Sequence, residues 1–384
     1  MNVVIIANGY PTYREPQYGC FEKDQAIALQ KEGHKVSILY VDGRFRKYYR
    51  RIGITHLQEN NIDIYGLYLF PTAFSLKMSC KLHYWLRTRM LDSVFSYMLK
   101  KQEKPDIIYA HFLYNISYAV YLKEKYNIPL VGMEHWSVLN QSELSSDIIY
   151  RGQIAYQGAN KIIAVSNSLK EQICRHFKKD SIVIHNMINE EFFQSSIRKY
   201  THRGKLKYIS IGSLIHRKGY DILIKALSEV ARYSLDWELR IVGGGPEEKN
   251  LQNLIKQLGL ESNIKMIGQK NKQEIKSLLY DSDVFIFSSR AENFSVAVLE
   301  ALSAGLPVVA TTCGGIRECI HERNGVLVPV EDISELAKSI SDISKNIELY
   351  DKQSIADECK KLFSPSVITK EITDVFRDVV NECK

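Results

Sequence analysis

Short apolar runs alternate with amphipathic stretches along the whole chain. The apolar runs of the first half are NVVIIA from residue 2, KVSILYVD from 35, PDIIYAH from 105, IPLVGMEH from 128 and KIIAVS from 161. Those of the second half are LKYISIGS from residue 206, ELRIVG from 238, NIKMIG from 263, DVFIFSS from 283 and PVVATT from 307. Short runs of this kind are typical of buried parallel strands, and the stretches between them space their apolar residues as helices do. The alternation therefore predicts βαβ units and an α/β fold with parallel sheets.

The stretch between residues 288 and 305, SSRAENFSVAVLEALSAG, brings candidate chemistry to the end of one predicted strand. Ligands of parallel sheets bind beyond the carboxyl ends of the strands. A helical pattern begins after Ser295, a candidate N-cap, and the backbone N–H groups at a helix start favour a phosphate or diphosphate. Glu292 and Glu300 bracket this start, and because a carboxylate only accepts hydrogen bonds, the pair suits sugar hydroxyls. The alternative is an ordinary helix with two solvated glutamates.

Two loops that contain glycine follow other strands of the second half. In the loop GSLIHRKG, residues 212–219, the first glycine and the cations Arg217 and Lys218 before the next helix predict a second phosphate cradle. In the loop VGGGPEE, Gly243 and Gly244 fit a wall that a nucleotide approaches closely. A dinucleotide fingerprint would need a further glycine where this chain has a glutamate, so a dehydrogenase is disfavoured. A solvated charge is the alternative for Lys218.

Candidate residues of the first half also stand at predicted strand ends. Gly9 and Tyr10 follow the first strand and Gly19 precedes the next helix, so a substrate is expected to approach the backbone there. An ordinary turn is the alternative. The imidazole and carboxyl groups at later strand ends are those of His111, Glu134 and His135. Because these groups end separate strands, we expect at least one of them to contact a substrate, although a single histidine is more often structural.

Length and cysteine content narrow the class of protein. The 384 residues suit two domains, each with its own core. The seven cysteines lack CxxC or zinc-finger spacing, which favours a reducing compartment and argues against a disulfide or metal framework. No basic leader precedes the first strand, and no apolar run approaches the ~18 residues of a spanning helix. These observations predict a cytoplasmic protein that holds no metal ion.

The net charge of +7 is unevenly distributed. Residues 1–200 contain 26 Lys and Arg against 18 Asp and Glu, and the excess is concentrated in RFRKYYRR, residues 44–51, and KMSCKLHYWLRTR, residues 77–89. Basic residues mixed with Tyr, Trp and Leu suit an anionic membrane surface, for which a solvated face is the alternative. No nucleic-acid-binding motif accompanies the charge, so a nucleic-acid partner is not expected.

The pair Glu292 and Glu300, with seven residues between them, is followed by ALSAGLPVVATTCGGIREC and later by NGVLVPVED. These motifs resemble the nucleotide-sugar half of the retaining family-four glycosyltransferases, also called glycosyl transferases group 1, of the bacterial cell-surface polysaccharide type. The resemblance covers nearly the whole chain and is densest over residues 208–329. It implies the GT-B fold, in which two Rossmann-like domains face each other across a cleft. The implied parts are an acceptor-binding domain over residues 1–195, a nucleotide-sugar-binding domain over 196–364 and a C-terminal helix over 365–384 that packs back on the first domain.

The resemblance also implies a role for each candidate residue. Lys218, with Arg217 and the backbone amides near Ser295, would neutralise a diphosphate leaving group in place of a metal ion. The implied catalytic residues are His111, Glu292 and Lys218. The implied donor-binding residues are Arg217, Gly212, Ser213, Gly243, Gly244, Phe294, Ser295, Val296 and Glu300, the last of which would hold the ribose. The implied acceptor-binding residues are Gly9, Tyr10, Gly19, Glu134 and His135.

The function implied is transfer of a hexosyl group, with retention, from a UDP- or GDP-sugar to a glycan or polyprenyl-linked acceptor at the inner face of the membrane. No cofactor beyond the nucleotide sugar is expected. One alternative is another enzyme on the same fold. A phosphorylase would need a pyridoxal lysine and usually a longer chain, and a sugar-nucleotide epimerase would leave the basic first half unexplained. The other alternative is a non-catalytic sugar-nucleotide-binding subunit, favoured by Ser213, which stands where family members usually have a cation.

Overall fold

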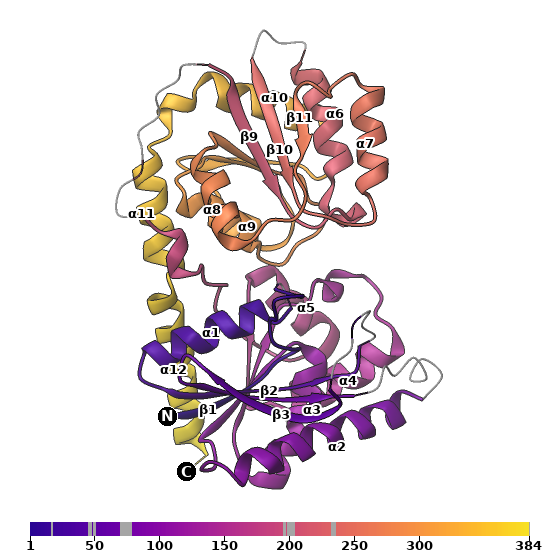
Figure 1. Cartoon of the computed structure of the whole chain (residues 1–384), viewed down its shortest axis with the longest axis vertical. Coiled ribbons are helices and arrows are strands. Elements are labelled where there is room, and N and C mark those ends of the chain that lie inside the picture. The colour runs from indigo at the N-terminus through magenta and orange to yellow at the C-terminus, as the bar shows by residue number, and fades with distance from the viewer. Residues whose placement is uncertain are drawn as a thin grey trace. The chain divides into compact units, whose positions relative to one another are not determined.

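The computed structural model describes residues 1–16, 18–44, 48, 51–69, 79–194, 197, 204–231 and 236–383. These residues form two compact units (Figure 1). The N-terminal unit is Met1–His185 together with Pro365–Lys384, and the C-terminal unit is Asn186–Ser364. Each unit contains a largely parallel sheet with helices packed against it, which confirms the predicted pair of Rossmann-like α/β domains.

The described residues of the N-terminal unit form an eight-stranded sheet. Its strands, in spatial order, are β3 (Gly53–Glu59), β4 (Ile62–Tyr68), β2 (Lys35–Asp42), β1 (Asn2–Ile6), β5 (Ile107–His111), β6 (Leu130–Glu134), β7 (Lys161–Ala164) and β8 (Ile182–Val183). Neighbouring strands are parallel except β3, which runs antiparallel to β4. The strand order reverses between β1 and β5, which is the point where open α/β sheets bind ligands.

The hairpin of β3 and β4 is a feature that the sequence prediction missed. Asn60 and Asn61 join its strands with φ angles of 52° and 59°. A two-residue turn with both φ angles positive matches the right-handed twist of a hairpin, and asparagine tolerates this conformation. The pair of asparagines between two β-rich runs was therefore the available signal for these strands.

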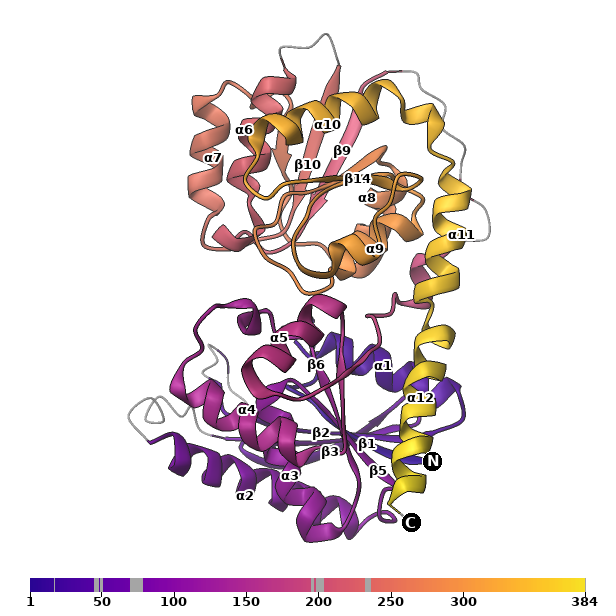
Figure 2. The same ribbon diagram turned by 180° about the vertical axis from the view of Figure 1, so that it is seen from behind.

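Helices cover both faces of the N-terminal sheet. The helix α1 (Cys20–Lys31) lies on one face, and α2 (Cys80–Leu99) and α3 (Leu113–Tyr126) lie on the other (Figures 1 and 2). Among the described residues before residue 185, the remaining helical segments are η2 (Ser137–Asn140), α4 (Ser146–Gly158) and α5 (Asn167–Phe177). The helices α2, α4 and α5 begin where the side chain of Ser79, Ser145 or Ser166 accepts a hydrogen bond from the backbone N–H three residues on.

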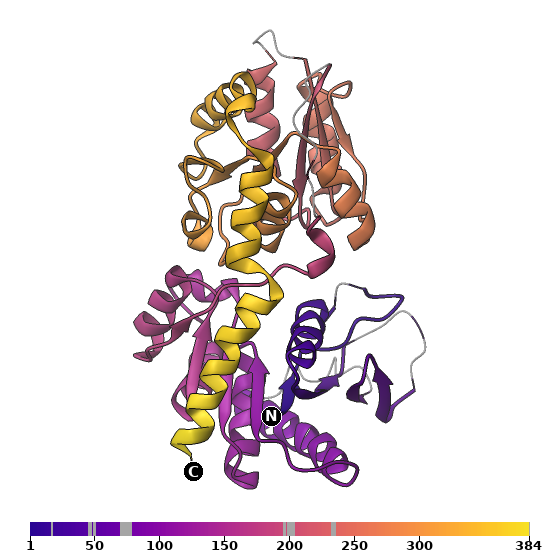
Figure 3. The same cartoon turned by 90° about the vertical axis from the view of Figure 1, so that its left-hand side faces the viewer.

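The last helix of the chain, α12 (Pro365–Glu382), belongs to the N-terminal unit. It lies against strands of this unit in Figure 3. Its Phe376 ring packs edge-on against the ring of Tyr109 on β5, with 5.0 Å between centroids, and both side chains are fully buried. Its Thr373 Oγ1 is 3.0 Å from Nε2 of His34, which follows α1. The helix thus completes the core on the side of the sheet that α1 covers.

The described residues of the C-terminal unit form a six-stranded, all-parallel sheet. Its strands, in spatial order, are β11 (Ile264–Met266), β10 (Trp237–Val242), β9 (Leu206–Ile211), β12 (Val284–Phe287), β13 (Val308–Thr311) and β14 (Gly325–Val328). Numbered along the unit, this is the Rossmann strand order 3-2-1-4-5-6. The order reverses between β9 and β12.

Two groups of helices cover the C-terminal sheet. One group is α6 (Tyr220–Val230), α7 (Glu248–Gln257) and α10 (Ile333–Lys345). The other is α8 (Lys272–Tyr280), α9 (Val296–Ser303) and α11 (Lys352–Phe363). Figure 1 shows α6 and α7 on one side of β9 and β10, and α8 and α9 on the other. The described residues of the unit also form short 3-10 turns, which are η3 (Glu190–Phe192), η4 (His216–Lys218), η5 (Gly314–Glu318) and η6 (Ile347–Leu349).

The division between the units falls at residue 185, whereas the sequence prediction placed it at residue 195. The intervening segment packs on the C-terminal unit. Ile188 N donates to Phe363 O over 2.9 Å, and Tyr280 Oη donates to Phe192 O over 2.9 Å. Residues 195, 196 and 198–203, which follow the predicted division, lie outside the described residues.

Candidate functional site

Two cations and a carboxylate meet where the strand order of the C-terminal sheet reverses. Arg217 and Lys218 lie in η4, after β9, and Glu292 lies in the loop between β12 and α9. Lys218 Nζ donates to Glu292 Oε2, and Arg217 Nη1 is 3.6 Å from Glu292 Oε1. The Lys218 and Glu292 side chains are 16% and 15% exposed, so salt screens this pair less than it screens a surface pair. Three residues that the sequence assigned to phosphate and sugar binding are therefore in contact.

Neighbouring loops hold this cluster in place. Arg290 N donates to Arg217 O over 2.8 Å, and the Arg290 guanidinium makes a bidentate ion pair of 2.8 and 2.9 Å with Asp221 on α6. This pairing holds the pKa of the Asp221 carboxyl below its ordinary value. Gly314 has a φ of 55° and packs so closely on the Glu292 carbonyl that a Cβ atom there would clash. The cations and the carboxylate thus belong to loops fixed by backbone contacts, as a pre-organised site requires.

The start of α9 lies beside this cluster in sequence. Ser295 occupies the N-cap position, as predicted, but its side chain accepts no capping hydrogen bond. Asn186 Nδ2 fixes the same loop by donating to Phe294 O over 2.9 Å. Val296 begins the helix and the partly buried Glu300 lies in its second turn. The first-turn amides of a helix have no acceptor within it, so this end favours an anion.

The glycine loops border Lys218. Gly243 has a φ of 145° and packs against Gly212, so that a Cβ atom on Gly243 would clash with the Gly212 carbonyl. A Cβ atom on Gly212 would lie 3.7 Å from Lys218 Cε, and one on Gly244 would lie 3.3 Å from the nearest side chain. Ser213 is exposed. Gly212 therefore lies close to the Lys218 side chain, so this loop borders the cation cluster.

The glycines expected at the acceptor side pack against each other. Gly19 has a φ of 77°, and a Cβ atom on it would clash with the Gly9 carbonyl, while the Tyr18 ring covers Gly9. Tyr10 Oη donates to Glu59 Oε2 over 2.7 Å, and burial together with this carboxylate raises the pKa of the Tyr10 phenol. Close packing within the loop is therefore one reason why the chain has glycine at positions 9 and 19 and tyrosine at position 10. Contact of Gly9, Gly19 and Tyr10 with an acceptor stays a prediction.

The strand-end residues His111 and Glu134 are both fully buried. His111 Nδ1 is 3.2 Å from His135 Nε2, and the other ring nitrogen of His111 has no partner among the described residues. Burial, with the neighbouring His135, lowers the pKa of His111 well below its ordinary value, so the ring is neutral. Glu134 accepts hydrogen bonds of 2.8–2.9 Å from the N–H groups of His135 and Trp136 and from the Tyr156 hydroxyl. Burial raises the pKa of Glu134 to about 7 despite these bonds. Glu134 therefore holds its own loop, and substrate contact by these residues stays a prediction.

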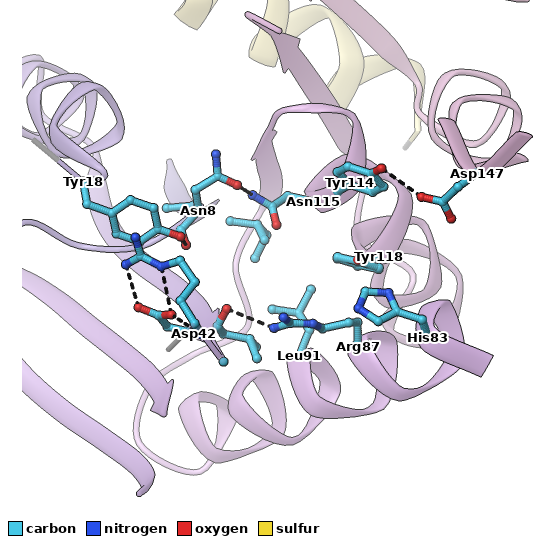
Figure 4. Close-up of a pocket in the computed structure, with 15 residues that line it drawn as sticks. Asn8, Tyr18, Asp42, His83, Arg87, Leu91, Tyr114, Asn115, Tyr118 and Asp147 are labelled. Atoms are coloured by element: carbon cyan, nitrogen blue, oxygen red, sulfur yellow. Dashed lines mark hydrogen bonds and ion pairs between the residues drawn. The ribbon is translucent and has the colours of Figure 1, made fainter. Parts of the chain in front are cut away.

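A cavity of about 280 Å³ in the N-terminal unit was missed by the sequence prediction (Figure 4). It lies at the carboxyl ends of β1 and β2 and against α2 and α3, where the strand order reverses. Its lining includes Asn8 after β1, Arg44 after β2, Arg87 on α2, and Tyr118 on α3. The reversal of strand order was the available signal for this cavity. Arg87 and Tyr118 were missed because they lie within helices, whereas the sequence analysis sought candidates at strand ends.

The helix α2 carries an exposed apolar and basic face. Leu82 is 46% exposed and Trp85 is 53% exposed, and the guanidinium carbon of Arg89 lies 5.9 Å from the Trp85 ring centroid. The first basic stretch, residues 44–51, is described only at positions 44, 48 and 51, and Lys77 and Met78 lie outside the described residues. Among the described helices, none is long and apolar enough to cross a membrane. Within the described ranges, no group of three or more His, Cys, Asp or Glu side chains is arranged to hold a metal ion.

Solved structures with the same fold show which fold class the chain has. Sucrose-phosphate synthase from Thermosynechococcus elongatus has a TM-score of 0.79 and 17% identity, with 99% of each chain covered. Anabaena HepE, in complex with UDP-glucose, has a TM-score of 0.72 and 18% identity, with 98% of this chain and 100% of that chain covered. The lipopolysaccharide outer core galactosyltransferase WaaB has a TM-score of 0.71 and 17% identity over the same shares. The fold is that of the GT-B glycosyltransferases.

Sequence comparisons give the family. The model of glycosyl transferases group 1 matches residues 192–357, and the model of glycosyltransferase family 4 matches residues 23–192. An uncharacterized glycosyltransferase of Haemophilus influenzae is 27% identical over 332 residues, which are 85% of this chain and 86% of that protein. WcaL of Salmonella typhimurium, a putative colanic acid biosynthesis glycosyltransferase, is 35% identical over 160 residues, which are 38% of this chain and 39% of that protein. Family models of glycosyltransferases thus match both halves of the chain, which confirms the resemblance of its motifs to the family-four, group 1 glycosyltransferases.

Proposed function

We propose that the chain transfers a hexosyl group from a nucleotide diphosphate sugar to a glycan or lipid-linked acceptor, with retention, in surface polysaccharide synthesis. The observation that carries the proposal is the contact of Lys218 and Arg217 with Glu292 where the C-terminal sheet reverses its strand order. Two cations near a helix start suit a diphosphate, and a carboxylate beside them suits sugar hydroxyls. Similarity to WcaL supports the polysaccharide context, and the UDP-glucose complex of HepE supports the donor class.

Lys218 and Arg217 would act on the leaving group. As the bond between the sugar and the diphosphate breaks, negative charge develops on the phosphate oxygens, and fixed cations stabilise it most at that stage. Both cations face Glu292 in the structure. The diphosphate oxygens would compete for them, and Glu292 would then accept hydrogen bonds from hydroxyls of the transferred sugar. Because the two cations balance the leaving group, the proposed reaction uses no divalent metal ion.

The remaining roles follow the family resemblance. Glu300, one turn into α9, would accept hydrogen bonds from the ribose of a UDP- or GDP-sugar, and the first-turn amides would bind a phosphate. His111 would contact the transferred sugar through a neutral ring, in keeping with its lowered pKa. The exposed Leu82 and Trp85 on α2, with Arg89 beside them, would hold the enzyme at an anionic membrane surface that carries lipid-linked acceptor.

A donor screen tests this function. The purified chain is incubated with UDP-, GDP- and ADP-sugars in the presence of EDTA, with and without crude lipid-linked acceptor, and released nucleotide diphosphate is measured. We expect release from one donor, retained in EDTA and strongly reduced in Lys218→Ala and Glu300→Ala. Lys249→Ala, at an exposed position on α7, is the matched control for removal of a lysine. Nucleotide binding without release from any donor would favour a non-catalytic binding subunit instead.

A further inference from the structure

We propose that the cavity of the N-terminal unit binds an anionic sugar, meaning a single sugar ring that carries a carboxylate or a phosphate, through the guanidinium of Arg87 (Figure 4). The proposal rests on the proposed function, since it identifies the chemical class of the acceptor's terminal residue. Three properties of the cavity support it: its charge balance, its hydrogen-bonding groups and its size.

The charge balance leaves one cation without an acidic partner. Asp42 is matched by Arg44, whose Nε and Nη2 donate to its two oxygens over 3.1 and 2.8 Å. Asp147 is matched by the buried Arg151, whose Nε donates to it over 2.8 Å. In the described part of the chain, Arg87 forms no ion pair, and its hydrogen bond to Val41 O is long, at 3.4 Å. A guanidinium has five N–H donors in a planar fork that fits a carboxylate or a phosphate.

The imidazole beside Arg87 adds a donor and no charge. His83 Nδ1 is 2.9 Å from Arg151 Nη2, and because arginine only donates, this ring nitrogen accepts. Burial, with the charges of Arg151 and Arg87, lowers the pKa of His83, so a neutral ring carries its proton on Nε2. Figure 4 shows His83 and Tyr118 close to Arg87. The positive charge offered to a ligand at neutral pH is therefore that of Arg87 itself.

The rest of the lining suits a sugar ring. Asn115 Nδ2 donates to Asn8 Oδ1 over 3.0 Å, and no partner for Asn8 Nδ2 or Asn115 Oδ1 is found among the described residues. These two atoms supply one donor and one acceptor for sugar hydroxyls. The rings of Tyr114 and Tyr118 line the same cavity and offer apolar surface. A mixture of aromatic surface and a few fixed polar groups is typical of small-molecule sites.

The size of the cavity limits the ligand. A volume of about 280 Å³ lies at the lower end for ligand pockets, so it suits one sugar ring with its charged substituent and not an oligosaccharide. The position is also that of a binding site, because the cavity lies where the strand order of the sheet reverses between β1 and β5.

Ligand-observed NMR titrations of the full chain test the proposal. The probes are methyl glucuronoside, glucose 6-phosphate and the neutral methyl glucoside. The variants are Arg87→Gln, the charge-preserving Arg87→Lys, and Arg175→Gln as the matched control. Arg175 lies on α5 of the same unit, is exposed, and does not line the cavity. Circular dichroism and thermal unfolding establish that each variant is folded.

We expect an anionic probe to bind at least about tenfold more tightly than the neutral glucoside, the usual effect of a charge-assisted hydrogen bond. Arg87→Gln should abolish this preference, Arg87→Lys should keep part of it, and Arg175→Gln should leave it intact. Tighter binding of the glucuronoside would show that the charged group of the ligand is a carboxylate, and tighter binding of glucose 6-phosphate would show that it is a phosphate. Equal binding of all three probes, or an intact preference in folded Arg87→Gln, would overturn the proposal. Release of nucleotide diphosphate by the wild type is measured separately. If the anionic probe binds but no nucleotide diphosphate is released, the proposed function fails and the proposal for the cavity does not.

Discussion

Replacing Glu134 by glutamine tests whether this buried carboxyl group keeps its proton in the folded chain, as its burial predicts. Glu134 is fully buried, and burial raises its pKa from 4.5 to about 7. Between pH 4.5 and 7 the unfolded chain has lost this proton while the folded chain keeps it. Stability therefore falls as pH rises through this window. One pKa unit corresponds to about 1.4 kcal/mol, so the wild type should lose about 3 kcal/mol of unfolding free energy between pH 4.5 and 7.5 through this group.

Glu134→Gln should remove this loss. Glutamine keeps the shape and an acceptor for the N–H groups of His135 and Trp136, and its NH₂ group can donate to the Tyr156 hydroxyl. The variant thus resembles the protonated wild type and should gain about 3 kcal/mol relative to it between pH 4.5 and 7.5.

The assay is urea unfolding across this pH range, followed by tryptophan fluorescence. The chain has three tryptophans, and a Trp237→Phe background leaves Trp85 and Trp136 as reporters of the N-terminal unit. Glu124→Gln, at an exposed position on α3, controls for the loss of one negative charge. If the difference between wild type and Glu134→Gln is the same at every pH, Glu134 is ionised throughout, and the burial argument is refuted.

Three further predictions concern the donor site, its loops and the membrane. Lys218→Ala should lower donor turnover by about 10²-fold, the usual effect of removing one group that stabilises developing charge, and steady-state kinetics checks this. Gly314→Ala should lower both thermal stability and nucleotide affinity, because its new Cβ atom would clash with the loop before α9. Its control is Gly259→Ala, at a position with a similar φ of 66° and open space around it. This variant should lose only about 1–2 kcal/mol of unfolding free energy and keep its nucleotide affinity. Trp85→Ala should weaken sedimentation with anionic vesicles, whereas Leu349→Ala, which removes an 81% exposed apolar side chain elsewhere, should not.

Most strands and the residues of the cation cluster were predictable because their signals are local. Apart from β3, β4, β8 and β14, each described strand appears as one of the short apolar runs, and Arg217, Lys218 and Glu292 follow runs whose carboxyl ends lie at one edge of a parallel sheet. The sequence could not show that Lys218 contacts Glu292, because the two positions come from strands that pair only in the folded sheet. The pairing of β9 with β12 brings them together.

The position of a residue at a strand end did not predict whether its side chain is buried. The sequence placed His111 and Glu134 at strand ends, and the structure places them there. Both side chains are nevertheless fully covered, and Glu134 bonds to its own loop and to Tyr156 on α4. A strand end gives the position of the backbone, whereas the helices and loops packed over it decide whether the side chain meets solvent.

The two reversal points of this chain differ in how their chemistry is encoded. At the C-terminal one, the cations and the carboxylate stand in loops that directly follow β9 and β12, so a motif search finds them. At the N-terminal one, the cation without an acidic partner in the described chain is Arg87, in the third turn of a 20-residue helix. There it lines the cavity together with Asn8 and Tyr118, although neither is near it in sequence. Substitutions on α2 and α3 can therefore change what this cavity binds without altering any strand-end motif. Family motifs should accordingly predict the donor chemistry of related chains better than the acceptor chemistry.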